Sequence, residues 1–148
     1  MKYHHYRHLS ISTAINAVIM YLAMYTMIDG LADFYNNINQ VYMVLMMGAP
    51  MVIIMLYDMR TMYTDKKLNL ILYAVSAALL VVGFVGMRTQ AAVGNEQFLR
   101  AMIPHHSGAI LMCGQASLSD PEIIKLCEGI KRSQQQEIDQ MKAMLERY

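Results

Sequence analysis

The sequence predicts an all-α membrane protein in which three transmembrane helices precede an extracytoplasmic α-hairpin. Three observations lead to this fold class. Three long apolar runs occupy the chain as far as Met87, lysine and arginine are unevenly distributed between these runs, and the composition becomes polar with helical periodicity after Arg88. No segment has the strict alternation of apolar and polar residues that is typical of a half-buried β-strand.

The composition excludes several classes of protein. Hydrophobic residues make up 56% of the 148 residues and charged residues 16%, against about 25% charged in an ordinary soluble domain. Such an apolar chain is not disordered. A formal net charge of +1 argues against a basic nucleic-acid-binding face. Two cysteines are too few for a disulfide scaffold.

The apolar runs set the extent of the predicted membrane domain, residues 1–88. They cover about residues 11–28, 41–57 and 68–87, and a span needs about 17–25 apolar residues. The alternative is three helices buried in a soluble core. A chain of 148 residues is too short to bury three such helices on all sides.

Basic residues orient the spans. Lys2 and Arg7 precede the first run, and Arg60, Lys66 and Lys67 lie between the second and third. The segment 29–40 contains neither lysine nor arginine. Positive residues remain on the cytoplasmic side, so we expect a multi-pass protein of the cell (inner) membrane. Its N-terminus is then cytoplasmic and residues 95–148 periplasmic or otherwise extracytoplasmic. The first run is interpreted as an uncleaved anchor rather than a signal peptide.

Residues 95–148 are predicted to form a helical hairpin. Asn95 is a candidate N-cap for a helix reaching about Leu118, with Pro104 as a site of kinking. Asp120 and Pro121 are typical of the N-cap and first residue of a second helix. The two helices are therefore antiparallel and joined by a short turn.

Polar residues interrupt the apolar faces of this hairpin. His105 and His106 border the apolar stripe of the first helix, and Gln134 and Glu137 fall within that of the second. Counted outward from the turn, Met102 is level with Glu137 and the histidines are level with Gln134. A carboxylate in a core costs several kcal/mol unless it has a partner.

Two interpretations of this layer remain open. In one, the side chains form a buried polar network that fixes the helix register. In the other, they hold a metal. Thioethers favour copper(I), and imidazole also suits zinc, the alternative metal. A single inward carboxylate disfavours a di-iron centre. The candidate ligands are His105, His106, Met102, Glu137 and Met141, supported by Gln134, Met112 and Met144.

Other sulfur and histidine residues carry weaker signals. Cys113 and Cys127 face each other across the hairpin, as a disulfide or thiols or else as a soft-metal thiolate pair. Methionine recurs every fourth residue in the second run, but each step rotates about 40°, so these side chains do not form one line. A cluster of three histidines precedes the first run at positions 4, 5 and 8.

The hairpin resembles the family called domain of unknown function 305. The resemblance rests on Met102-Ile103-Pro104-His105-His106, followed by Gln134, Glu137-Ile138 and Met141. Upstream, the segments 39–43, 49–51 and 62–69 look like the membrane-anchored branch of that family. The resemblance implies a ferritin-like helical fold, extracytoplasmic placement and an association with copper or silver, with the His-His pair and methionines as ligands. Many members carry two hairpins, so this single hairpin implies a homodimer.

We therefore expect a membrane-anchored metal-binding protein for soft-metal homeostasis or tolerance. A structural oligomerisation module without metal is the second hypothesis, and a metal-dependent redox enzyme the third. The sequence has no nucleophile–base pair, phosphate loop or cofactor fingerprint, so we do not expect an enzyme. The expected partners are membrane lipid and a second copy of this chain. The sequence does not identify a metal-handling partner protein. The dimer would complete a four-helix bundle through Met102, Ala109, Ile130 and Met141.

Overall fold

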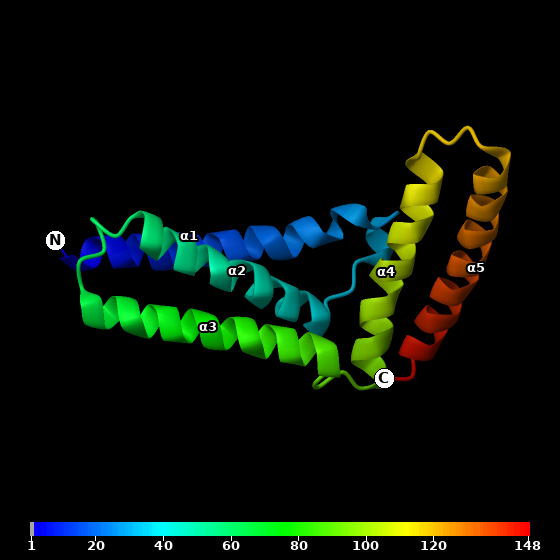
Figure 1. The fold of residues 1–148 in the computed structure, drawn as a ribbon. Coiled ribbons are helices and arrows are strands. Elements are labelled where there is room, and N and C mark those ends of the chain that lie inside the picture. The colour runs from blue at the N-terminus through cyan, green and yellow to red at the C-terminus, as the bar shows by residue number, and fades with distance from the viewer. Residues whose placement is uncertain (1) are drawn as a thin grey trace. The chain divides into compact units, whose positions relative to one another are not determined.

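The protein is all-α, as predicted (Figure 1). The computed structural model describes the backbone of residues 2–148 and the side chains of residues 4–148; the side chain of Lys2, used above to orient the chain, lies outside them. No strand occurs in this part of the chain. The helices are α1 (Lys2–Ala23), η1 (Met24–Met27), η2 (Leu31–Asp33), α2 (Ile38–Asp58), α3 (Lys66–Thr89), α4 (Asn95–Gln115) and α5 (Pro121–Leu145), where η denotes a 3₁₀ helix.

The chain forms two compact units, each made of two separate stretches of sequence. The first unit comprises residues 1–23 and 39–91, and the second comprises residues 24–38 and 92–148. The predicted boundary differs in one respect. Residues 24–38, expected to belong to the membrane domain, pack with α4 and α5 because their polar groups find partners there.

Three helical segments are long and apolar enough to cross a membrane: His4–Met27, Ile38–Asp58 and Lys66–Thr89. Only 11%, 17% and 17% of their most apolar stretches are buried inside the protein. Three helices of a soluble core would be buried on most sides. This exposed apolar surface is suited to lipid, as expected for membrane spans.

Glycines bring α2 and α3 into close contact in the first unit. A Cβ added at Gly86 would lie 2.6 Å from the Tyr42 ring, and one at Gly83 would lie 3.0 Å from the Tyr42 carbonyl oxygen. The Tyr42 hydroxyl donates a 2.6 Å hydrogen bond to the carbonyl of Ala91. Small residues at such crossings are typical of helix packing in membranes.

The opposite end of the first unit is held by tyrosines. Tyr6 and Tyr63 pack with Leu56, which is fully buried. The Tyr6 hydroxyl donates a 2.7 Å hydrogen bond to Oδ1 of Asn69. Asp65 caps α3 by accepting bonds from two backbone N–H groups of its first turn. The basic segment between α2 and α3 is thereby fixed against the start of α1.

The methionines of α2 are dispersed, in agreement with their predicted sweep around the helix. Met43 exposes 36% of its surface and Met47 exposes 52%. Met51, in contrast, accepts a 3.2 Å contact from the Asn16 amide, which also reaches the sulfur of Met20 at 3.0 Å. The sulfurs thus do not form one line along α2.

The second unit contains the predicted hairpin. Helices α4 and α5 run antiparallel (Figure 1) and enclose a core of Leu99, Ile103, Ile138 and Met141. Ile103 and Ile138 are fully buried.

The helix ends agree with prediction in part. Asp120 accepts a 2.8 Å bond from the N–H of Glu122 and Pro121 begins α5, as predicted. At the start of α4, however, Gly94 is the N-cap, and Asn95 is the first helical residue. The Asn95 amide instead donates a 3.0 Å bond to the Tyr148 hydroxyl, which closes the open end of the hairpin. Helix α4 continues through buried Pro104.

Candidate metal centre

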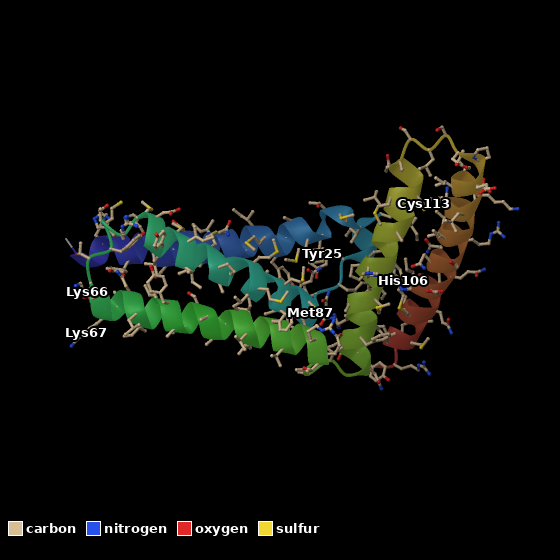
Figure 2. All side chains as sticks on the ribbon, viewed as in Figure 1. Tyr25, Lys66, Lys67, Met87, His106 and Cys113 are labelled. Atoms are coloured by element: carbon tan, nitrogen blue, oxygen red, sulfur yellow. A yellow bond between two sulfur atoms is a disulfide. The ribbon has the colours of Figure 1, made fainter. Side chains whose placement is uncertain are left out.

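A histidine and a carboxylate meet between the two helices of the hairpin. Nδ1 of His106 lies 3.0 Å from Oε2 of Glu137. The carboxylate is out of line for a hydrogen bond, and Nδ1 is shielded from solvent with no hydrogen-bond partner. Figure 2 places His106 in the middle part of α4, and 12% of its side chain is exposed. The arrangement leaves a nitrogen with unused bonding capacity beside a negative charge.

The environment of His106 favours its neutral form. Burial lowers the pKa of His106; the Glu137 carboxylate opposes this shift, and the neighbouring His105 adds to it. Burial is the largest of the three influences. Because neutral imidazole is the form that coordinates metals, His106 is prepared for ligation near neutral pH.

Glu137 and His105 differ from their predicted positions. Glu137 exposes 49% of its side chain, because the neighbouring Ile138 takes the core position expected for it. Its charge therefore keeps much of its hydration, and the desolvation cost that demanded a partner is reduced. His105 is exposed, and its ring centre lies 6.1 Å from that of His106. Successive residues on a helix point about 100° apart, which separates the two rings.

Two methionines lie one helical turn from this contact. Met102 precedes His106 by four residues and Met141 follows Glu137 by four, so in antiparallel helices they share the next layer. Met141 is 7% exposed and belongs to the hairpin core, against which Met102 also packs. Their thioethers are therefore packing groups adjacent to the His106–Glu137 contact.

The observed pairing is displaced by one turn from the predicted register. Counting along the backbone had placed the histidines level with Gln134, whereas His106 contacts Glu137. Side chains lean toward the N-terminus of their own helix. Those of α4 therefore lean away from the turn and those of α5 lean toward it, so long side chains meet one turn further along.

The predicted supporting residues divide into two groups. Met144 packs, half-buried, against the hairpin core, and Gln134 is also half-buried. Met112 exposes 53% of its surface, beyond the layer of His106. The structure thus keeps Met144 close to Met141 and leaves Met112 at the surface.

The cysteines form a disulfide, Cys113–Cys127, between α4 and α5, with their Cα atoms 5.3 Å apart (Figure 2 labels Cys113). Of the alternatives left open by the sequence, the structure thus has the disulfide and not a pair of thiolate ligands. A crosslink between helices restricts the unfolded chain and so stabilises the hairpin.

A second polar cluster escaped the sequence analysis. Ser107 is fully buried, because residues 24–38 cover its face of α4. Its hydroxyl accepts a 2.7 Å bond from the N–H of Asp29 and donates a 2.6 Å bond to Asp33. Lys142 on α5 reaches the other carboxylate oxygen of Asp33 at 2.6 Å.

The sequence held one signal for this cluster. Gly108 follows Ser107, and a Cβ at Gly108 would lie 3.3 Å from the carbonyl oxygen of Met27. Two small residues side by side, off the apolar stripe, indicate a place where another segment approaches a helix closely. Which segment approaches was not readable from α4 alone.

The number of possible ligands near His106 limits the metal site that one hairpin can form. Among residues 4–148, no group of three or more His, Cys, Asp or Glu side chains is placed to hold a metal ion. The hairpin supplies two such donors, on His106 and Glu137, with the thioethers of Met102 and Met141 one turn away. Further ligands would come from those sulfurs, from water or from a second copy.

Comparison with known proteins relates both units to a family. A family model described as "Domain of unknown function (DUF305)" matches residues 57–145, which include α3, α4 and α5. The chain is also 32% identical, over 120 residues, to an uncharacterized protein of Acanthamoeba polyphaga mimivirus; the match covers 80% of this chain and 77% of the viral protein. No solved structure is significantly similar to the chain.

Proposed function

The chain belongs to the DUF305 family, and on this premise we propose that it is a membrane-anchored metal-binding protein for soft-metal homeostasis or tolerance. Copper(I) or silver(I) is the favoured ion and zinc the alternative. One observation carries metal binding at this centre: the shielded Nδ1 of His106 faces Oε2 of Glu137 at 3.0 Å without a hydrogen bond. The choice of ion rests on the neighbouring methionines.

The spacing of these two atoms suits two ligands of one ion. With metal–ligand bonds of about 2.0–2.2 Å, two donors lie about 2.9 Å apart at a right angle and about 3.4 Å apart at the tetrahedral angle. The observed 3.0 Å falls within this interval. An ion between the atoms would also use the nitrogen lone pair that the protein itself leaves without a partner.

The neighbouring residues decide which ion is favoured. Met102 and Met141 lie in the adjacent layer, and thioethers prefer copper(I) and silver(I) over harder ions. Imidazole suits both copper and zinc, whereas a carboxylate contributes more to zinc or copper(II). A site that uses both methionines selects the soft monovalent ions, and one that uses Glu137 selects zinc.

The contacts of residues 24–38 support placing the hairpin on the extracytoplasmic side of the membrane. Asp29 and Asp33 lie between the first two spans, and both bond to Ser107 of α4. The hairpin and this segment must then lie on the same side of the membrane. The segment carries no lysine or arginine, which favours the extracytoplasmic side. The disulfide is suited to the same oxidising side.

The ligand set of one hairpin is small for a tight site, which supports pairing of two copies. Two hairpins in a ferritin-like four-helix bundle would bring two sets of His106, Glu137 and methionines together. Mass photometry of the detergent-solubilised protein should then find two protomers. A protein that is monomeric with metal bound would contradict the bundle while leaving the site intact.

Metal analysis of variants tests the function. The purified full chain should hold copper in stoichiometric amount after desalting, and His106→Ala should lose it. His105→Ala is the matched control, because this neighbouring histidine is exposed and apart from the contact. Equal, near-zero metal in the wild type and both variants would instead favour the second candidate, a structural module in which Glu137 and His106 only fix the register.

A further inference from the structure

A second pair of metal-binding side chains lies in the first unit, at the beginning of α1. His4 and His8 are one helical turn apart, both exposed, and their Nε2 atoms are 3.2 Å apart. The ring centres are 4.3 Å apart, with the ring planes inclined by 60°. Residues four apart share a face of a helix, so the backbone of α1 holds the pair in place.

We propose that His4 and His8 form a two-histidine chelate for a borderline divalent ion, Zn²⁺ or Ni²⁺. Two imidazole nitrogens bonded to one ion at about 2.0–2.1 Å lie about 2.9–3.4 Å apart, and the observed Nε2–Nε2 distance of 3.2 Å falls in this range. To bind the ion through both Nε2 atoms, the ring that donates the hydrogen bond must carry its proton on Nδ1 instead, so that both Nε2 lone pairs face the ion.

The chemistry of the pair defines the ligand class. Its donors are nitrogens alone, which suit Zn²⁺ and Ni²⁺ and lack the sulfur that selects copper(I). His5 does not join the pair, since its ring centre lies 6.1 Å from that of His4, at 87°. Water completes the coordination of an ion at this exposed position. The chelate therefore exchanges its ion readily, unlike a closed structural site.

The His4–His8 pair lies at the start of the first candidate span. The candidate span that contains α1 starts at His4 itself. An ion held here would be bound where the first span meets the aqueous phase, and it would crosslink the first two turns of α1. This assignment is independent of the function proposed for His106 and Glu137.

Titration of the full chain tests the chelate. All variants are built on His106→Ala, so that the hairpin centre does not contribute, and purified in detergent with a tag that lacks histidine. Zn²⁺ and Ni²⁺ should each bind, and His8→Ala should weaken binding at least about tenfold, because the chelate becomes a single ligand. His5→Ala is the matched control and should change affinity less than about threefold.

Thermal unfolding provides a second readout. Added Zn²⁺ should raise the melting temperature of the His106→Ala protein and leave that of the His8→Ala derivative unchanged, because an ion bound only to the folded chain stabilises it. Equal affinities with and without His8 would overturn the proposal. So would a loss with His5→Ala as large as that with His8→Ala, since the ligands would then not be the pair one turn apart.

Discussion

Replacing Glu137 by glutamine separates the structural and metal-binding roles of the hairpin centre. Glutamine keeps the length of the side chain and removes its charge. Glu137 is 49% exposed and makes no aligned hydrogen bond to His106. An ion contact at such a position contributes about 0–1 kcal/mol, so the metal-free Glu137→Gln protein should unfold within about 1 kcal/mol of the wild type.

Metal affinity should respond differently. If Glu137 ligates the ion or orients a metal-bound imidazole, its loss weakens binding by about 10- to 100-fold. A site held by Met102, Met141 and His106 depends less on the carboxylate than a zinc site does. We therefore expect a small loss for Cu(I) and Ag(I) and a large loss for Zn(II).

Parallel competition titrations with the three ions measure these affinities. Glu128→Gln is the control, since it makes the same change at an exposed position of α5 outside the contact. Equal, large losses for all three ions would refute the soft-ligand assignment. Unchanged affinity for all three would remove Glu137 from the site.

Three further predictions concern the second unit. Because burial lowers the pKa of His106, the unfolded chain binds a proton at pH values where the folded chain does not. The metal-free protein should therefore lose stability as the pH falls below the usual histidine pKa of 6.5 and through the lower pKa of the folded state. Urea unfolding curves measured over a series of pH values should show this loss, and His106→Gln should make it smaller. Ser107→Ala should destabilise the unit by about 2–4 kcal/mol, because it removes the hydrogen-bond partners of the Asp29 N–H and of Oδ2 of Asp33, whose Oδ1 keeps Lys142. Chemical unfolding should show this loss, and a loss no greater than that of the exposed-site control Ser133→Ala would contradict it. A cysteine at exposed position Ser117 should react with an impermeant maleimide in intact cells, whereas labelling only after permeabilisation would reverse the proposed orientation.

Much of the fold was readable from the sequence because it rests on local signals. The three apolar runs depend only on composition, and α2 and α3 extend the second and third runs by one to three residues at each end. Helix α1, in contrast, begins nine residues before the first run and ends at Ala23. The start of α5 followed from the stereochemistry of Asp120 and Pro121. These features depend on neighbouring residues in the chain and not on tertiary contacts.

The candidate site was predicted less fully, for two physical reasons. Counting residues along two helices gives the level of each Cα but not the lean of the side chains. It grouped Glu137 with the histidines but placed it one turn away from them, whereas the side chains of His106 and Glu137 are in contact. A helical wheel also assigns one buried face to a helix. Helix α4 has a second one, at Ser107, which becomes buried only because a distant segment packs there.

The discontinuity of the second unit sets an order of events during synthesis. Residues 24–38 leave the ribosome before α2 and α3, yet their partner Ser107 lies on α4 and Lys142 lies on α5. Chains are made from the N-terminus, at about 5–20 residues per second. The carboxylate of Asp33 therefore stays in water while α2 and α3 are translated, because its last partner, Lys142, is made only with the final helix. A ribosome paused after α3 would hold a chain in which α1, α2 and α3 are complete and this carboxylate still lacks both of its partners.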